Sequence, residues 1–513
     1  MKKHLKTSVL LLSILVMVSC KDDADDSKYS ELEISEASAA LNAYFEAEFE
    51  KDVAESPMMQ TQLGRKTDYG KWDDFSNKKM VQDLEKAKER QKYLQDNVEE
   101  IVLNDETRLS YQLFMQEVEN EIADFEFRFH NYPVNQMFGY HSQVPAFLIN
   151  MHRIDSIADA KAYISRLNGI PQAFDDAIEG IKLREQNGIL LPKFVFEKVL
   201  DDSHNVIKGR PFTSSKEASV LLDDFKTKIS KLKLSEKQNM DLIAAAEQAL
   251  VNSVKPAYEK LIATMEDQQQ RATSDDGAWK FPKGEAFYKN RLKRITTTDL
   301  TANEIHEIGL LEVARIHGEM EEIMKKVRFE GSLQDFFEFM RTDQQFYYEN
   351  TPEGKEKYLK EATALINTMK GRLDELFLTK PKADIIVKAV EPFREKSAGK
   401  AFYQQPAIDG SRPGTYYANL YDMNAMPTYQ MEALAYHEGI PGHHMQIAIA
   451  QELDDVPMFR KFGRYTAYSE GWGLYSELVP KEIGFYKDPY SDFGRLAMEL
   501  WRSCRLVVDT GIH

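Results

Sequence analysis

Apolar residues recur at helical spacing over most of the chain. Three stretches show the pattern clearly: Ile34, Leu41, Phe45 and Phe49; Tyr111, Phe114, Val118, Ile122 and Phe125; and Ile316, Met320, Ile323 and Val327. Such spacing places the apolar side chains on one face of a helix. Strand-like alternation is scarce, and residues 416–420 are the best strand candidate. We therefore predict a mostly α fold, a single helical unit from residue 30 to residue 513, arranged as two lobes with a small β-sheet between them.

The N-terminus has the pattern of an export signal. Lys2, Lys3 and Lys6 precede a short apolar run over residues 9–18, which is too short to span a bilayer. Ser19 and Cys20 follow, and the whole segment resembles a bacterial lipoprotein signal, in which the cysteine is lipidated. We expect residues 1–19 to be removed and Cys20 to hold the chain on a lipid bilayer, with an ordinary signal peptide as the alternative.

The mature start, Cys-Lys-Asp-Asp, resembles a tag that directs some lipoproteins to the cell surface of Gram-negative bacteria. Residues 20–29 are polar and predict a flexible tether. We therefore expect an exported lipoprotein on the periplasmic or the cell-surface face of the outer membrane.

Composition narrows the class of function. The chain has 513 residues, 42% of them hydrophobic, and a formal net charge of −17. A chain of this length and composition can bury a sizeable core. The negative charge argues against a nucleic-acid partner, and two cysteines cannot build a disulfide framework.

One segment, His437-Glu438-Gly439-Ile440-Pro441-Gly442-His443-His444, indicates metal chemistry. Zinc peptidases commonly place two histidines four residues apart on a helix, with a glutamate beside the first as general base. Here proline occupies the fourth position, and the available histidines lie six and seven residues after His437. On a straight helix these positions are displaced by about 9 Å and about 10.5 Å. A local bulge at Pro441-Gly442 could bring either His443 or His444 back to the metal.

A third ligand is available farther along the chain. Glu470 and Glu477 lie seven residues apart, and therefore on one face of a predicted second helix. One carboxylate can bind a metal while the other orients a ligating histidine. The alternative is that both are ordinary solvated carboxylates, although their aromatic neighbours argue against full exposure.

The segments His437–Gln446 and Glu470–Tyr475 resemble the bacterial family called domain of unknown function 885, which is grouped with gluzincin metallopeptidases and is rich in predicted lipoproteins. The resemblance extends over most of the mature chain. It implies a large helical metallopeptidase-like fold around a cleft, with a zinc ion held by His437, by His443 or His444, and by Glu470. It also implies Glu438 as the catalytic base and leaves Glu477 to support a ligand.

The family's pattern continues beyond the motif at which this chain ends, so the sequence predicts a chain truncated at its C-terminus. His513 could stabilise an oxyanion as a catalytic residue, or it could be a frayed terminal residue.

Tyr417 and Asn419 belong to a predicted edge strand against which a peptide substrate could pair, with a purely structural strand as the alternative. Arg502 and Arg505 could bind a substrate carboxylate or form ion pairs with nearby acids.

The leading hypothesis is a lipid-anchored zinc metallopeptidase that hydrolyses peptides outside the cytoplasm. One alternative is a zinc hydrolase that acts on another amide or on an ester. A second is a surface lipoprotein that binds a ligand without turnover. The sequence does not indicate the oligomeric state.

Overall fold

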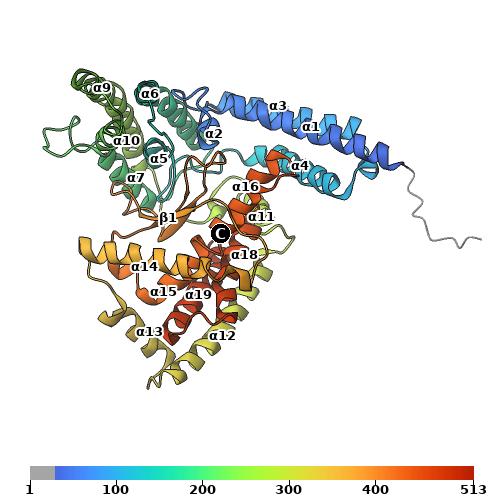
Figure 1. The fold of residues 1–513 in the computed structure, drawn as a ribbon, viewed down its shortest axis with the longest axis vertical. Helices are drawn as coiled ribbons and strands as arrows, with labels where there is room; N and C mark the ends of the chain where they lie inside the picture. The colour runs from blue at the N-terminus through green and yellow to red at the C-terminus, as the bar shows by residue number, and fades with distance from the viewer. Residues whose placement is uncertain (1–28) are drawn as a thin grey trace, which may run out of the picture.

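The computed structural model describes residues 29–513, and the signal segment and Cys20 lie outside the described residues. Figure 1 shows two groups of helices, one above and one below a small sheet. The first group comprises α1 (Glu31–Glu55), α2 (Pro57–Gln62), α3 (Asn77–Asn97), α4 (Asp105–Asp124), α5 (Tyr140–Asn150), α6 (Ile157–Gln186), α7 (Lys193–Val206), α8 (Val220–Ile229), α9 (Glu236–Ala249) and α10 (Lys255–Gln269). The second group follows α11 (Gly284–Thr296) and comprises α12 (Ala302–Lys326), α13 (Leu333–Thr342), α14 (Pro352–Lys370), α15 (Thr428–Glu438), α18 (Thr466–Glu482) and α19 (Pro489–Ile512). Helices α16 (His443–Glu452) and α17 (Met458–Phe462) reach up to the first group, where α17 packs against α1.

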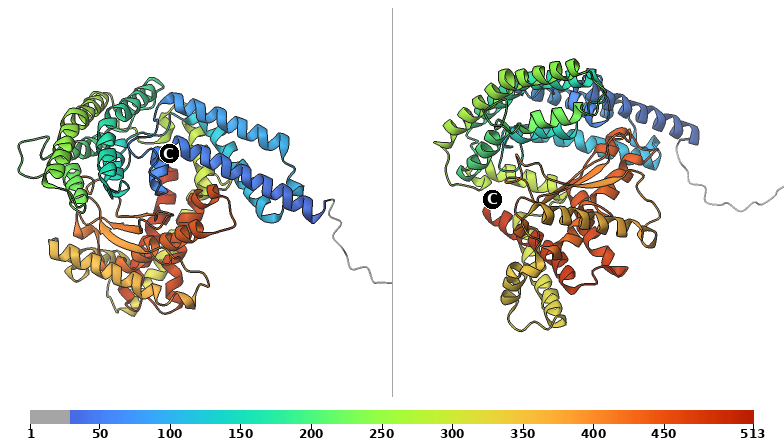
Figure 2. Two further views of the ribbon diagram at one scale, coloured as in Figure 1. Left: turned by 45° about the horizontal axis from the view of Figure 1, so that its top comes forward. Right: turned by 60° about the vertical axis from the view of Figure 1, so that its left-hand side comes forward.

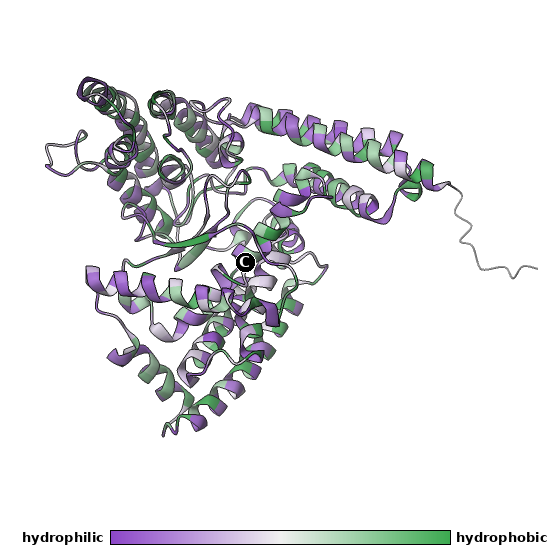
Figure 3. Ribbon diagram, viewed as in Figure 1, coloured by the Kyte–Doolittle hydropathy of each residue, from purple (hydrophilic) through white to green (hydrophobic). Residues whose placement is uncertain are grey.

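The helices begin where the sequence provides caps. Thr301 and Glu304 form the predicted capping box of α12, and Ser30 and Glu33 form another at the start of α1. The apolar residues predicted to share a helix face are the ones that point inward: Leu41, Phe45 and Phe49 are buried on α1, and Ile316, Met320 and Ile323 are buried on α12. Figure 3 shows the resulting division of the long helices into hydrophobic and hydrophilic sides. The predicted helical fold is therefore confirmed.

The sheet has three short strands and lies between the two groups of helices (Figure 2). Strand β3 (Gly414–Ala418) is central, with β1 (Ile385–Ala389) parallel to it on one side and β2 (Ala401–Gln404) antiparallel on the other. All five residues of β3 are buried. The predicted strand exists, but its predicted position at an edge was wrong, because both of its sides already carry a partner strand.

Two long helices set the frame of the lower group. Gly309 of α12 faces Leu506 and Val507 of α19 so closely that a Cβ atom there would lie within 3 Å of both side chains. At the end of the pair, His306 and Thr510 lie within hydrogen-bonding distance, 3.1 Å apart. This packing fixes α19, which reaches the candidate site described below. Within residues 29–513, each helix is too short or too polar to serve as a membrane span.

Candidate metal centre

The His-Glu segment lies at a break between two helices. Helix α15 ends at Glu438 and α16 begins at His443, so the predicted bulge is a complete interruption over residues 439–442. Gly442 makes the tight return possible, since a Cβ atom at this position would lie 1.9 Å from the carbonyl oxygen of His437. Trp472 of α18 donates a 2.8 Å hydrogen bond to the carbonyl oxygen of Pro441. The break therefore replaces the single helix turn that normally separates two ligating histidines.

Substitution of Gly442 by alanine is expected to disrupt this return. The added Cβ meets backbone atoms, which cannot move aside as a flexible side chain can. We therefore expect the free energy of unfolding to fall by about 1–3 kcal/mol. Gly318 on α12 has no atom within 4 Å of an added Cβ and serves as the control. Gly318→Ala should be neutral or stabilising by up to about 1 kcal/mol. Urea denaturation checks both values, and equal stabilities of the two variants would contradict the close packing at Gly442.

Three of the predicted ligands converge. One ligand atom from each of His437, His443 and Glu470 lies within 4.8 Å of the others. The Nε2 atom of His437 is 3.6 Å from Oε2 of Glu470, and Nε2 of His443 is 3.6 Å from Oε1 of the same carboxylate. Two imidazoles and a carboxylate are a donor set typical of catalytic zinc sites. The side chain of Glu470 is 56% exposed whereas that of His437 is 4% exposed, so the centre opens to solvent on the Glu470 side.

His444 does not join this cluster. Its Nδ1 atom lies 2.9 Å from the hydroxyl of Tyr403, and its Nε2 atom lies 2.9 Å from the carbonyl oxygen of Ala383. Both ring nitrogens therefore have protein partners on the side of the sheet. Of the two histidines that the sequence left open, the geometry favours His443.

A second layer of side chains orients His437. The carboxylate of Glu477 accepts a 2.8 Å hydrogen bond from Nδ1 of His437, which leaves Nε2 facing Glu470. Gly473 lies between the two glutamates on α18, and an added Cβ there would be 2.5 Å from the His437 ring. The absence of a side chain lets α18 approach the imidazole. Arg502 of α19 pairs with Glu477 at 3.2 Å, as the ion-pair alternative predicted, and its amino group also lies 3.2 Å from Nδ1 of His437.

Glu438 is buried beside this cluster, with one carboxylate oxygen unpaired. Its side chain is inside the protein, and its Oε2 atom has no hydrogen-bond partner among residues 29–513. Burial raises the pKa of Glu438 to about 7, while the charge of His437 opposes this shift. An unpartnered buried carboxylate is unfavourable for folding, and a pKa near neutrality suits a group that accepts and releases a proton.

The clustered side chains have perturbed pKa values. Burial alone would lower the pKa of His437, but hydrogen bonds to Glu470 and Glu477 outweigh it and raise the pKa to about 9. The hydrogen bond with His437 lowers the pKa of Glu470, and burial together with the charge of His437 lowers that of His443. The centre therefore holds a proton on His437 that a metal ion has to displace.

Three other predicted site residues lie apart from the cluster. Tyr417 is buried, with its hydroxyl bonded to Asn150 at 2.9 Å, and the Asn419 amide donates to the carbonyl oxygens of Glu395 and Ala398. Both side chains hold the sheet together, so their predicted role in binding substrate was wrong. His513 lies eleven residues beyond Arg502 on α19, about 16 Å farther along the helix.

The ring of His513 has a structural partner. Its Nδ1 atom accepts a hydrogen bond of 2.9 Å from the backbone N–H of Ala278. The prediction of His513 as an oxyanion-stabilising residue was wrong, since neither its position nor its bonding directs it to the cluster. Arg505 is exposed on α19, and its role in binding substrate stays a prediction.

Sequence reasoning missed Tyr403, Gly473 and Arg464. Tyr403, which contacts His444, lies outside both motifs. Gly473 lies within the segment Glu470–Tyr475, but its close approach to His437 depends on the packing of α18 against α15. Arg464 lies six residues before Glu470 and outside both motifs.

Comparison with known proteins agrees with this description. Residues 57–513 match the family described as "Bacterial protein of unknown function (DUF885)". The chain belongs to this family. The match covers most of the chain and confirms the resemblance found in the sequence. No curated protein matches the chain.

Two solved structures share the fold of this DUF885 protein. The "putative lipoprotein from Colwellia psychrerythraea" superposes with a TM-score of 0.83 at 27% sequence identity, covering 94% of this chain and 83% of that one. A "putative lipoprotein of unknown function from Shewanella oneidensis" superposes with a TM-score of 0.61 at 16% identity, covering 92% of this chain and 83% of that one. The second likeness shows the fold alone.

Proposed function

We propose that this DUF885 protein is an exported, lipid-anchored zinc peptidase. The observation that carries the proposal is the convergence of His437, His443 and Glu470 beside Glu438, a buried carboxylate whose Oε2 atom has no hydrogen-bond partner within residues 29–513. The donor set fits zinc because it contains one carboxylate and two imidazoles, which bind zinc in their neutral form. Glu477 supports this assignment. A histidine that binds a metal through one ring nitrogen usually donates a hydrogen bond from the N–H of the other to a carboxylate or a carbonyl group, and Glu477 is in this position beside His437.

When bound, zinc supplies a Lewis acid and lowers the pKa of water in the site. The protein supplies the remaining functions. Glu438 accepts a proton from the water that attacks the peptide carbonyl, and it delivers that proton to the leaving amine. Glu477 holds His437 in one tautomer, and the exposed side of Glu470 leaves room for substrate.

Hydrolysis of another amide or of an ester would use the same groups, and the substrates described below distinguish these reactions. A purely ligand-binding role is less well supported. A binding protein gains nothing from a buried carboxylate without a partner, which costs folding free energy.

Attachment to a bilayer is part of the proposal. A protein of the same fold, 27% identical, is described as a putative lipoprotein, and the sequence around Cys20 resembles a lipoprotein signal. Periplasmic or surface exposure on the outer membrane follows from that signal. Mass spectrometry of the protein purified from membranes should find a diacylglyceryl group on Cys20.

The test of the proposed activity is metal-dependent cleavage. The purified protein should contain about one zinc ion per chain, measured by inductively coupled plasma mass spectrometry. It should cleave members of an unstructured peptide mixture, lose that activity after dialysis against a chelator and regain it with zinc. Matched ester and non-peptide amide substrates are assayed in parallel. Well-folded protein that binds no zinc, or that binds zinc and cleaves no peptide, would exclude the peptidase function.

A further inference from the structure

A cavity of about 660 Å³ lies next to the candidate metal centre. One wall includes Gln446, which follows His443 by one turn on α16, and another includes Tyr468 and Ser469, which directly precede Glu470 on α18. Residues that neighbour His443 and Glu470 in the chain therefore line the cavity. The volume is within the range of small-molecule and peptide subsites.

Most of the cavity surface is apolar. Leu109 and Leu113 of α4, Ile447 of α16 and Phe459 of α17 contribute to it. Tyr468 is 60% exposed and Leu453 is 45% exposed, so both side chains are accessible to a molecule in the cavity. Gln446 of α16 and Ser469 of α18 add polar groups to this lining. The cavity can thus take an apolar side chain together with its backbone.

The charges around the cavity are mostly positive, in contrast with the net charge of −17 of the chain. Arg460, Lys461 and Arg464 line it, and the structure gives none of the three an ion pair within residues 29–513. Arg294 pairs with Asp124 at 3.0 Å, and Glu117 is the single carboxylate in the lining. Arg464 is exposed and is steadied by a hydrogen bond to the side chain of Gln405. A guanidinium positioned in this way is suited to bind a carboxylate.

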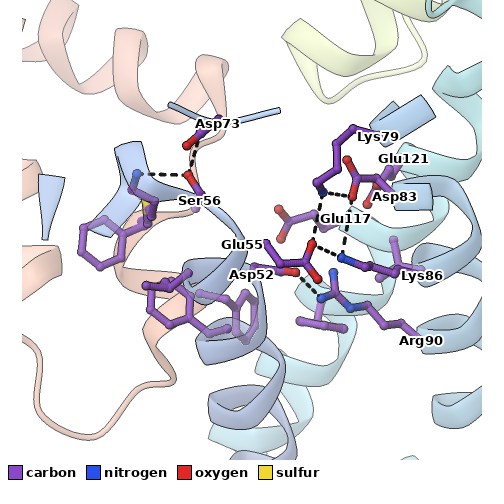
Figure 4. Close-up of a pocket in the computed structure, with 18 of the residues that line it drawn as sticks. Asp52, Glu55, Ser56, Asp73, Lys79, Asp83, Lys86, Arg90, Glu117 and Glu121 are labelled. Atoms are coloured by element: carbon purple, nitrogen blue, oxygen red, sulfur yellow. Dashed lines mark hydrogen bonds and ion pairs between the residues drawn. The ribbon is translucent and has the colours of Figure 1, made fainter. Parts of the chain in front are cut away.

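The neighbouring cavity has the opposite character (Figure 4). It measures about 550 Å³ and shares Glu117, Phe459 and Phe462 with the first cavity. Its three cations face carboxylates: Lys79 pairs with Asp83, Lys86 with Glu55, and Arg90 with Asp52. Further acids, among them Asp73, Asp74 and Glu121, leave this second cavity negative. An anionic group is therefore repelled from the second cavity and retained in the first.

We propose that the first cavity binds the C-terminal residue of a peptide, with an apolar side chain against α4 and α17 and the free terminal carboxylate on Arg464. This inference rests on the proposed function and makes the enzyme a peptidase that acts near the C-terminal end of apolar peptides. A terminal carboxylate suits the cavity better than an acidic side chain does. Only a terminal residue combines a carboxylate and an apolar side chain on one carbon atom.

Binding to the metal-free full chain tests the inference separately from catalysis. The probes are N-acetyl-leucyl-leucine, its C-terminal amide, and N-acetyl-aspartyl-leucine amide, which carries its carboxylate on a side chain. Calorimetry should show that the free acid binds roughly tenfold to a hundredfold more tightly than either amide, because one charge-assisted contact is lost in the amides. In Arg464→Gln the preference for the acid should disappear. Arg328→Gln, which removes an exposed arginine at the end of α12, should retain it.

Equal binding of the acid and the amide by the wild-type protein, or a preference that survives in Arg464→Gln, would overturn the inference. Tight binding of the aspartyl amide would overturn the assignment to a terminal carboxylate and indicate recognition of acidic side chains. Cleavage of the same probes by the zinc-loaded protein is measured separately. If the free acid binds through Arg464 and no peptide is cleaved, the binding site stands while the proposed peptidase function fails.

Discussion

Exchange of Glu438 for glutamine is expected to slow peptide cleavage by about 10²- to 10⁴-fold while leaving the zinc content unchanged. Removal of a general base typically has an effect of this size. Glutamine keeps the shape of the side chain but cannot accept the proton of the attacking water. Zinc should remain because Glu438 is not one of the three clustered ligand residues.

The Glu438→Gln variant should be at least as stable as the wild-type protein. Burial raises the pKa of Glu438 to about 7, so the native state resists its ionisation, and the neutral amide should not lower the free energy of unfolding. Initial rates on a peptide mixture, zinc content and urea denaturation together check the prediction. Glu482→Gln, an exposed carboxylate at the end of α18, is the matched control. Full activity in Glu438→Gln would mean that another group accepts the proton.

Replacement of Glu470 or of His443 by alanine is expected to weaken zinc binding by more than about 100-fold, since loss of even a supporting partner commonly costs 10- to 100-fold. His444→Ala should retain zinc. That variant loses its contacts with Tyr403 and with the carbonyl oxygen of Ala383, so its expected defect is in stability.

Competition with a chromophoric chelator measures the three affinities. The comparison of His443 with His444 is the sharpest part of the experiment because both variants remove a buried histidine from the same turn of α16. Zinc loss in His444→Ala with retention in His443→Ala would reverse the ligand assignment. Circular dichroism establishes that each variant is folded before its affinity is interpreted.

The helical fold could be predicted because its signals are local. Spaced apolar residues and the Thr301–Glu304 capping box mark α12, and Pro441 with Gly442 marks the interruption after α15. The choice between His443 and His444 could not be made in this way. It depends on how the chain turns through residues 439–442, and on Tyr403 and Ala383, which come from segments about 40 and 60 residues away in the sequence.

The sheet shows the same limit. Residues 416–420, which lie between the turn-forming residues Arg412-Pro413-Gly414 and Asp422, identify β3. Strands β1 and β2 are too short to have a strong pattern of their own. Whether β3 is central or lies at an edge is decided by those two partners. For that reason the sequence suggested a surface for pairing with a peptide where the structure has a fully buried strand.

The interruption between α15 and α16 would also link the stability of the folded protein to the zinc concentration around it. The three proposed ligand residues come from α15, α16 and α18, so an ion held there would crosslink helices that the backbone joins through loops. Under the proposed function, free zinc at a hundred times its dissociation constant adds about 2.7 kcal/mol to the stability of the folded state. Outside the cytoplasm, the lifetime of the protein against proteases then depends on how much zinc the compartment supplies.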